Sequence, residues 1–225
     1  MEKEELLQQY EARGDVFVEA KRLYEQALEE MPDATLLTKY GYLLECHGRF
    51  SIRKAVGQYE RSIDLDPSDD QTHYQLIGAY AGLREPQRAI ALYQQRLATS
   101  PRDLREHRFL AYAYLAGHED AEARGVVDAG LELAPEDSML IEFRGDVRAG
   151  TGDPDGALAD WRRAHELNPE SLSSIYSSAF LLEREGQLEE AVEAWRFIIE
   201  WCDLRGFAPD VEWPKREIER LRASG

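Results

Sequence analysis

The apolar and polar positions of this sequence repeat at a regular interval. An alanine recurs at Ala20, Ala55, Ala89, Ala123, Ala157 and Ala191, a spacing of about 34 residues that is typical of helical repeat proteins. A large apolar or aromatic residue follows each alanine by four positions, at Tyr24, Tyr59, Tyr93, Val127, Trp161 and Trp195. A proline follows the first five alanines by twelve positions, at Pro32, Pro67, Pro101, Pro135 and Pro169. Three linked positions that keep one period predict an array of repeated units.

Each unit reads as two helices joined by a short turn. In the third unit, Leu76, Ile77 and Tyr80 mark one face of the first helix. Residues 82–85 then make the turn, and Pro86 begins the second helix, where the missing N–H of proline costs nothing.

The alanines are expected where the two helices of a unit cross most closely, because a larger side chain would push the helix axes apart. A glycine or alanine in the first helix serves the same crossing at Gly41, Ala111, Gly145 and Ala179. The large residue four positions after each alanine is expected to fill the space between one unit and the next.

With these offsets the sequence resembles the tetratricopeptide repeat family, whose unit of about 34 residues has small residues, an aromatic residue and a closing proline. The family's Leu-Gly-x-x-Tyr piece is matched by Leu110-Ala111 with Tyr114 and loosely by Tyr40-Gly41 with Leu44. The resemblance implies an all-α fold, a right-handed α-solenoid or superhelix of about six helix-turn-helix units with a C-terminal capping helix. The units are expected at residues 1–33, 34–67, 68–101, 102–135, 136–169 and 170–203, followed by a loop and the capping helix at 204–225.

Two features depart from the family pattern. Arg144 and Arg148 stand in the fifth unit where Leu and Tyr would pack, so we expect their aliphatic stems in the core and their charged ends paired with carboxylates. The sixth unit has Asp203 in place of the closing proline, so its second helix is expected to continue through Trp201 and Cys202.

The charge and composition narrow the class of partner. A net charge of −17 disfavours nucleic acid, because binding to a phosphate backbone draws on lysine and arginine, and it disfavours anionic membranes. No apolar run approaches the roughly 18–20 residues of a membrane span, and the N-terminus lacks the pattern of a secretory signal. Cys46 and Cys202 lie in distant repeats, so we expect them to be reduced, as in a cytoplasmic protein.

We expect no catalytic activity, no metal and no cofactor. His73 and His107 are one repeat apart, so they occupy equivalent positions in neighbouring units and are expected in the core, too far from each other to share a metal. No Cys/His cluster has the spacing of a zinc site. Residues 150–153 lack the downstream lysine of a phosphate-binding loop and are expected to form a turn.

A second stripe of residues, one step around each first helix from its core stripe, is the candidate binding surface. In the resembled family this stripe lines the concave surface where members usually hold peptides. Its tyrosines and arginines are residue types that dominate binding energy at interfaces, and its glycine lets a partner backbone approach closely. The candidate partner-binding residues of this concave groove are Tyr42, Tyr74, Gly78, Arg105, Arg108, Tyr112, Glu142, Asp146, Tyr176 and Phe180.

Some members of the family clamp a C-terminal carboxylate with lysines and asparagines of their first helices. Glu4 and Gln8 stand at the corresponding positions of the first unit, so this clamp is not expected here. Arg105 and Arg108 are expected either to pair with an acidic group of a ligand or to pair with Glu142 and Asp146 of the next unit.

The sequence therefore predicts a non-enzymatic scaffold or adaptor that holds a peptide or protein segment in its groove. One alternative is a self-assembling structural protein with a homodimer contact around Trp195, Trp201 and Trp213. Another is a regulatory accessory subunit of an enzyme. The last helix, expected to begin near Trp213, is interpreted as a cap with a polar outer face, with docking of a partner as the alternative.

Overall fold

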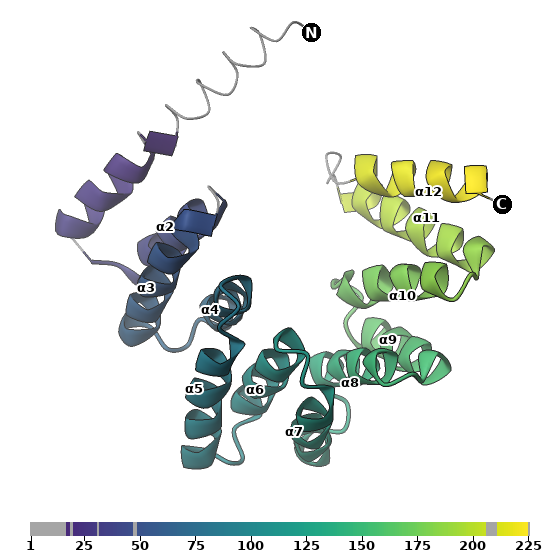
Figure 1. Ribbon diagram of the computed structural model, residues 1–225, viewed down its shortest axis with the longest axis horizontal. Coiled ribbons are helices and arrows are strands. Elements are labelled where there is room, and N and C mark those ends of the chain that lie inside the picture. Colours follow the sequence, from purple (N-terminus) through teal and green to yellow (C-terminus); the bar gives the residue numbers. More distant parts are fainter. Residues whose placement is uncertain (1–16, 19, 31, 47–48, 206–210, 225) are drawn as a thin grey trace, which may run out of the picture. The chain divides into compact units, whose positions relative to one another are not determined.

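The described part of the chain is built from helices joined by short turns (Figure 1). The computed structural model describes residues 17–18, 20–30, 32–46, 49–205 and 211–224, and it contains no strand in these ranges. Residues 17–18 and 20–30 are helical. The helices that follow are α2 (Ala34–Cys46), α3 (Arg49–Leu65), α4 (Asp70–Gly82), α5 (Pro86–Thr99), α6 (Leu104–Ala116), α7 (Asp120–Leu133), α8 (Ser138–Gly150), α9 (Pro154–Leu167), α10 (Ser173–Arg184), α11 (Leu188–Arg205) and α12 (Glu212–Ser224). The predicted all-α class is confirmed.

The chain forms two compact bodies. The N-terminal body comprises residues 1–101 and 112–117, and the C-terminal body comprises residues 102–111 and 118–225. In the N-terminal body α2 packs on α3, α3 on α4 and α4 on α5. In the C-terminal body each helix from α7 to α12 packs on the next one in the sequence (Figure 1). Contacts between sequence neighbours are the arrangement that a stack of helix pairs requires.

The helices of a pair meet where a small residue of the first helix faces an aromatic ring of the second. A Cβ atom placed on Gly41 would lie 2.5 Å from the ring of Tyr59, and one on Gly145 would lie 2.6 Å from the ring of Trp161. The repeated alanines at positions 55, 89, 123, 157 and 191 are fully buried. The rings were expected between one unit and the next. The structure corrects this expectation. The glycine of the first helix has no side chain, and the space that this leaves is filled by the ring of the second helix in the same pair.

In three of the helix pairs, the polar atom of the large ring is held by a carboxylate of the first helix. The Tyr59 hydroxyl donates to Glu45 Oε2 at 2.9 Å. Trp161 Nε1 donates to Asp146 Oδ1 at 3.0 Å. The third ring, Trp195, donates from Nε1 to Glu183 at 2.7 Å. A buried N–H or O–H needs such an acceptor, so the position of the ring also determines the position of the carboxylate.

The turn inside each pair from the third to the sixth uses one residue in the left-handed backbone region. These residues are Arg84, His118, Gly152 and Gly186, with φ of 62°, 59°, 85° and 75°. They occupy the same position of successive repeats. Glycine adopts this region without strain, whereas a side chain makes it costly. Pro86 and Pro154 begin α5 and α9, as predicted from the sequence.

Both histidines expected in the core are buried. His73 is hydrogen-bonded through Nδ1 to the Tyr93 hydroxyl at 2.9 Å and through Nε2 to the carbonyl oxygen of Pro67 at 3.1 Å. His107 is hydrogen-bonded through Nδ1 to the carbonyl oxygen of Asp103 at 3.0 Å. Their partners are core and turn groups, which confirms a structural role.

The C-terminal end of the chain follows the sequence expectation. Helix α11 continues to Arg205, through Trp201 and the buried thiol of Cys202. Helix α12 packs on α11 and buries Ile218 and Leu221 against it. The last helix therefore covers the apolar face that the sixth pair would otherwise expose.

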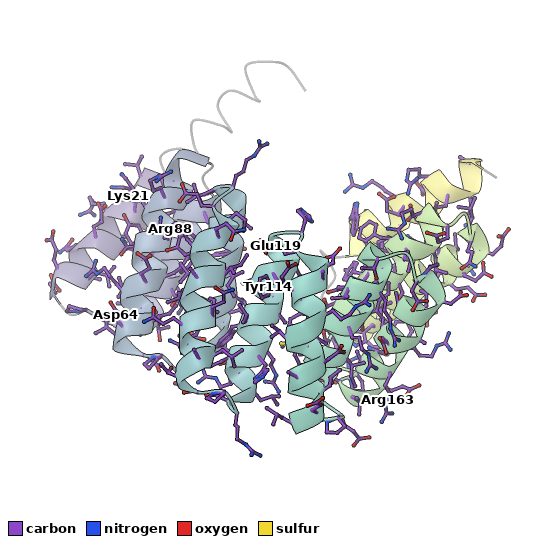
Figure 2. All side chains as sticks on the ribbon, turned by 60° about the horizontal axis from the view of Figure 1, so that its bottom comes forward. Lys21, Asp64, Arg88, Tyr114, Glu119 and Arg163 are labelled. Atoms are coloured by element: carbon purple, nitrogen blue, oxygen red, sulfur yellow. The ribbon has the colours of Figure 1, made fainter. Side chains whose placement is uncertain are left out.

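Arg88 and Arg163, labelled in Figure 2, are exposed arginines that pair with carboxylates. Arg88 lies 3.2 Å from Glu85, and Arg163 lies 2.8 Å from Glu136. Exposed pairs of this kind contribute little to stability because water and salt screen them.

Two glycine substitutions test the packing of the helix pairs. Gly145→Ala should lower the free energy of unfolding by about 1–3 kcal/mol, because its Cβ would press on Trp161. Gly78→Ala is the matched control, since a Cβ there meets nothing within 4 Å and alanine favours a helix by about 0.5–1 kcal/mol. Chemical denaturation followed by circular dichroism measures both changes. Equal loss of stability in the two variants would contradict the packing argument.

Candidate functional site

The most open part of the predicted stripe in the N-terminal body is a pocket beside Tyr42. Tyr42 is 57% exposed, an unusual fraction for a tyrosine in the middle of a helix. The pocket has a volume of about 390 Å³ and a mainly apolar wall. It is lined by Tyr24, Thr38, Lys39, Tyr42, Leu43 and Gln75. The side-chain oxygen of Gln75 is buried and has no hydrogen-bond partner within the described residues.

Thr38, one of the residues that line this pocket, is held in place by hydrogen bonds between hydroxyl groups. Thr38 Oγ1 lies 2.7 Å from Ser62 Oγ and 2.7 Å from Thr72 Oγ1, so one side chain of α2 is linked to α3 and α4. Ser62 also donates to the carbonyl oxygen of Ala34 at 2.8 Å. Because Ser62 and Thr72 are buried, the network holds the three helices in a defined register.

Two further tyrosines of the stripe come together beside an open helix surface. The rings of Tyr74 and Tyr112 meet edge to face, with centroids 5.3 Å apart. Both side chains are partly exposed. Gly78 lies one turn after Tyr74, and a Cβ placed there would meet open space. The structure thus brings Tyr74 and Tyr112 together, as a continuous binding stripe requires.

The arginines of the stripe have intramolecular contacts. Arg108 pairs with Asp137, its Nε lying 3.1 and 3.2 Å from the two carboxylate oxygens. Asp137 is buried and also caps α8, accepting the N–H of Leu140 at 3.0 Å. The guanidinium of Arg105 lies 5.7 Å from the ring centroid of Phe109.

The expected pairing of Arg105 and Arg108 with Glu142 and Asp146 was wrong. Glu142 accepts a hydrogen bond from Ser173 Oγ at 2.6 Å, and Asp146 accepts the one from Trp161. Both carboxyls therefore have neutral donors. Arg108 instead reaches the capping carboxylate at the start of α8, which the repeat pattern does not reveal.

The other two arginines predicted to pair with carboxylates do so. Arg144 binds Asp160 with two hydrogen bonds, of 2.9 Å from Nε and 2.7 Å from a terminal nitrogen. Arg148 lies 2.8 Å from one oxygen of the same carboxylate. Asp160 is only 4% exposed, so the two arginines offset the cost of burying its charge.

Burial makes Glu142 and Asp146 hard to ionise. Loss of contact with water raises the pKa of Glu142, and the hydrogen bond from Ser173 opposes this effect. Burial, with repulsion from Glu142, raises the pKa of Asp146 from 3.8 to about 7, against the hydrogen bond from Trp161.

The last two residues of the predicted stripe are in contact with the protein's own C-terminal helix. Trp213 of α12 stacks on Tyr176, with centroids 6.0 Å apart, and lies 5.7 Å from Phe180. Both residues also meet Trp195 edge to face, at 5.8 and 5.3 Å. Phe180 stays 49% exposed. The stripe is thus partly covered at this end, because α12 packs where a seventh unit would begin.

The tryptophans proposed for a homodimer contact are engaged within the chain. Trp195 is fully buried and offers no surface of its own to another molecule, whereas Trp213 is 39% exposed. Trp201 donates from Nε1 to the carbonyl oxygen of Pro169 at 3.0 Å, and the guanidinium of Arg205 lies 4.1 Å from its ring centroid.

Sequence reasoning missed Lys39, Leu43 and Gln75, which line the pocket beside Tyr42. Leu43 and Gln75 stand directly after Tyr42 and Tyr74 of the predicted stripe, so a wider stripe would have included them. The first-unit positions Glu4 and Gln8 lie outside the described residues.

Searches for other kinds of site give no candidate among the described residues. In these residues no three histidine, cysteine, aspartate or glutamate side chains are grouped to hold a metal ion. None of the helices in the same ranges has the length and apolar character to cross a membrane.

Stacked helix pairs with one regular sequence period define a helical-repeat protein. No family model matches the sequence, and no curated protein matches it. Several solved structures are similar to this chain. The thermophilic TPR protein TTC0263 of Thermus thermophilus is 21% identical in sequence and superposes with a TM-score of 0.66, and the match covers 84% of this chain and 99% of that protein. A tetratricopeptide repeat protein of Parabacteroides merdae is 17% identical in sequence and superposes with a TM-score of 0.56, and the match covers 99% of this chain and 93% of that protein. The chain has the tetratricopeptide repeat fold, as its sequence resemblance predicted.

The pKa of Asp146 predicts a dependence of stability on pH. Because the folded pKa of about 7 lies above the ordinary 3.8, the folded state binds more protons between these values, and stability falls as pH rises from about 4 to 7. Asp146→Asn, which keeps an acceptor for Trp161, removes this loss. A pKa difference of about 3 corresponds to at most ~4 kcal/mol of stability. At pH 8 we therefore expect the variant to be more stable than the wild type by on the order of 1–2 kcal/mol, which is below this upper bound.

Chemical denaturation between pH 4 and 9 measures this effect. The stability difference between Asp146→Asn and the wild type should grow from pH 4 to pH 7 and stay constant above it. Asp203→Asn, at an exposed position of α11, is the control for loss of one charge. A difference that does not change with pH would contradict the assignment.

Proposed function

We propose that this chain is a non-enzymatic, cytoplasmic scaffold that binds a peptide or protein segment through the tyrosine stripe of its N-terminal body. The observation that carries the proposal is the pocket of about 390 Å³ beside the exposed Tyr42, with Gln75 among the residues that line it. The tetratricopeptide repeat fold supports the same class of function by analogy.

The pocket suits a segment of extended backbone with one apolar side chain. Its volume lies in the range of small-ligand sites, and its wall is mainly apolar, so an aliphatic or aromatic side chain would lose water on entry. Gln75 also lines the pocket, and its side-chain amide can form a hydrogen bond with the backbone of the segment. This hydrogen bond adds both affinity and direction.

The neighbouring tyrosines extend the surface in the same body. Tyr74 and Tyr112 offer partly exposed rings, and tyrosine supplies a large contact area with little loss of side-chain freedom. The open surface at Gly78 allows a partner backbone to come close to α4. Since Tyr176 and Phe180 contact Trp213 in the C-terminal body, we place the principal peptide site in the N-terminal body.

The proposal is tested with peptides selected from a phage-displayed random library. Selected peptides should carry an apolar anchor, and Tyr42→Ala should weaken their binding at least tenfold in fluorescence anisotropy, as loss of an interface anchor does. Leu65→Ala is the matched control, because Leu65 is similarly exposed at 54%, lies in the same body and does not line the pocket.

Circular dichroism checks that both variants keep their helices. Equal weakening in Tyr42→Ala and Leu65→Ala, or a library that yields no binder, would contradict a peptide site at this pocket.

A further inference from the structure

The C-terminal body contains a second pocket of different chemistry. It has a volume of about 330 Å³ and lies among α8, α9 and α10. It is lined by Asp146, Ala149, Trp161, Ser177, Phe180, Leu181 and Arg184. It therefore combines a carboxyl group, a hydroxyl group, an exposed aromatic ring and one arginine.

The carboxyl group of Asp146, a partly buried residue, differs from those of the two buried aspartates of this body. Asp137 pairs with Arg108, and Asp160 pairs with two arginines. Within the described residues, the hydrogen-bond donor to Asp146 is the neutral N–H of Trp161. A buried carboxylate without a cation is costly, so the charge of Asp146 is left unbalanced when it ionises.

The charged groups around Asp146 add to this imbalance. Glu142 on the same helix and Asp120 from α7 both repel its negative charge. From α9, Trp161 donates its indole N–H to Asp146 and opposes the rise of the pKa. From α10, Arg184 lines the pocket, but its exposed guanidinium binds Glu185 at 3.2 Å and the carbonyl oxygen of Ala149 at 3.4 Å.

We propose that this pocket binds a lysine or arginine side chain of a partner protein, with the cationic group at Asp146 and the aliphatic stem along Phe180. The inference extends the proposed scaffold function, since it gives the partner a basic segment, but it concerns a different pocket. The Phe180 ring is 49% exposed and offers an apolar face to the stem. Ser177 Oγ lies in the same wall and can accept a second N–H of the cation.

The charge of the whole chain favours the same class of partner. With a net charge of −17, the protein attracts basic segments over long range and repels acidic ones. The pocket then supplies the short-range contact, in which a cation and a carboxylate meet away from bulk water.

Binding should depend on pH, because the cation prefers the ionised form of Asp146. With its pKa near 7, Asp146 is mostly protonated at pH 6 and mostly ionised at pH 8. The affinity for a lysine side chain should therefore rise about tenfold between these two values. In turn, bound lysine should lower the pKa of Asp146.

The experiment uses Nα-acetyl-lysine methylamide as the ligand and the indole N–H resonance of Trp161 as the reporter. This N–H donates to Asp146, so its ¹H–¹⁵N signal responds to both protonation and occupancy of the carboxylate. Trp161→Phe assigns the signal among the four tryptophans of the chain. We expect a saturable shift with the lysine and arginine compounds, and none with the norleucine compound, which has a stem of the same length without the charge.

Matched variants decide between this site and general attraction to an acidic protein. Asp146→Asn should weaken lysine binding at least tenfold, whereas Asp203→Asn, at an exposed carboxylate outside the pocket, should change it less than twofold. Equal weakening in the two variants, equal binding of the norleucine compound, or no shift at pH 8 would overturn the inference. Tyr42→Ala should leave lysine binding unchanged, so failure of the peptide site in the N-terminal body would not affect this result.

Discussion

The contact on which the rest of the structure depends is the one between a residue without a bulky side chain in the first helix of a pair and an aromatic ring in the second. At Gly41 and Gly145 even a single added carbon would overlap the ring. The ring in turn carries a polar atom that must be satisfied inside the pair, and a carboxylate of the first helix does so at Glu45, Asp146 and Glu183. Helix packing therefore places a carboxylate beside each of these rings.

The consequences differ from pair to pair because the surroundings of the carboxylate differ. Glu183 also pairs with Arg220 of α12, so its charge is balanced within the chain. Asp146 sits at the same kind of position but next to Glu142 and Asp120, with an indole N–H as its donor, and its pKa rises. A residue that packing requires as a hydrogen-bond acceptor is thereby left with a charge that is costly to form and is not balanced by a cation within the described residues.

Much of the fold could be predicted because it depends on local spacing. The alanine period, the prolines at helix starts and the buried His73 and His107 follow from distances along the chain. The site was less predictable. Arg108 binds Asp137 in the next repeat, and Trp213 returns to Tyr176, because helix ends and the last helix bring together residues that no repeat position relates. The pocket beside Tyr42 depends on Gln75, whose buried and unpaired oxygen follows from packing among helices rather than from the pattern.

The distribution of arginines explains why the two bodies offer different chemistry. The chain has 44 acidic and 27 basic residues, so carboxylates outnumber their possible partners. In the C-terminal body, Arg108, Arg144 and Arg148 are used to balance Asp137 and Asp160, which are nearly inaccessible to water. Arg184 lines the pocket of Asp146 but binds Glu185 and the carbonyl oxygen of Ala149, so within the described residues no cation balances Asp146. In the N-terminal body the pocket is mainly apolar and Gln75 in its lining offers a neutral amide, so an uncharged stretch of backbone fits it better than a basic side chain.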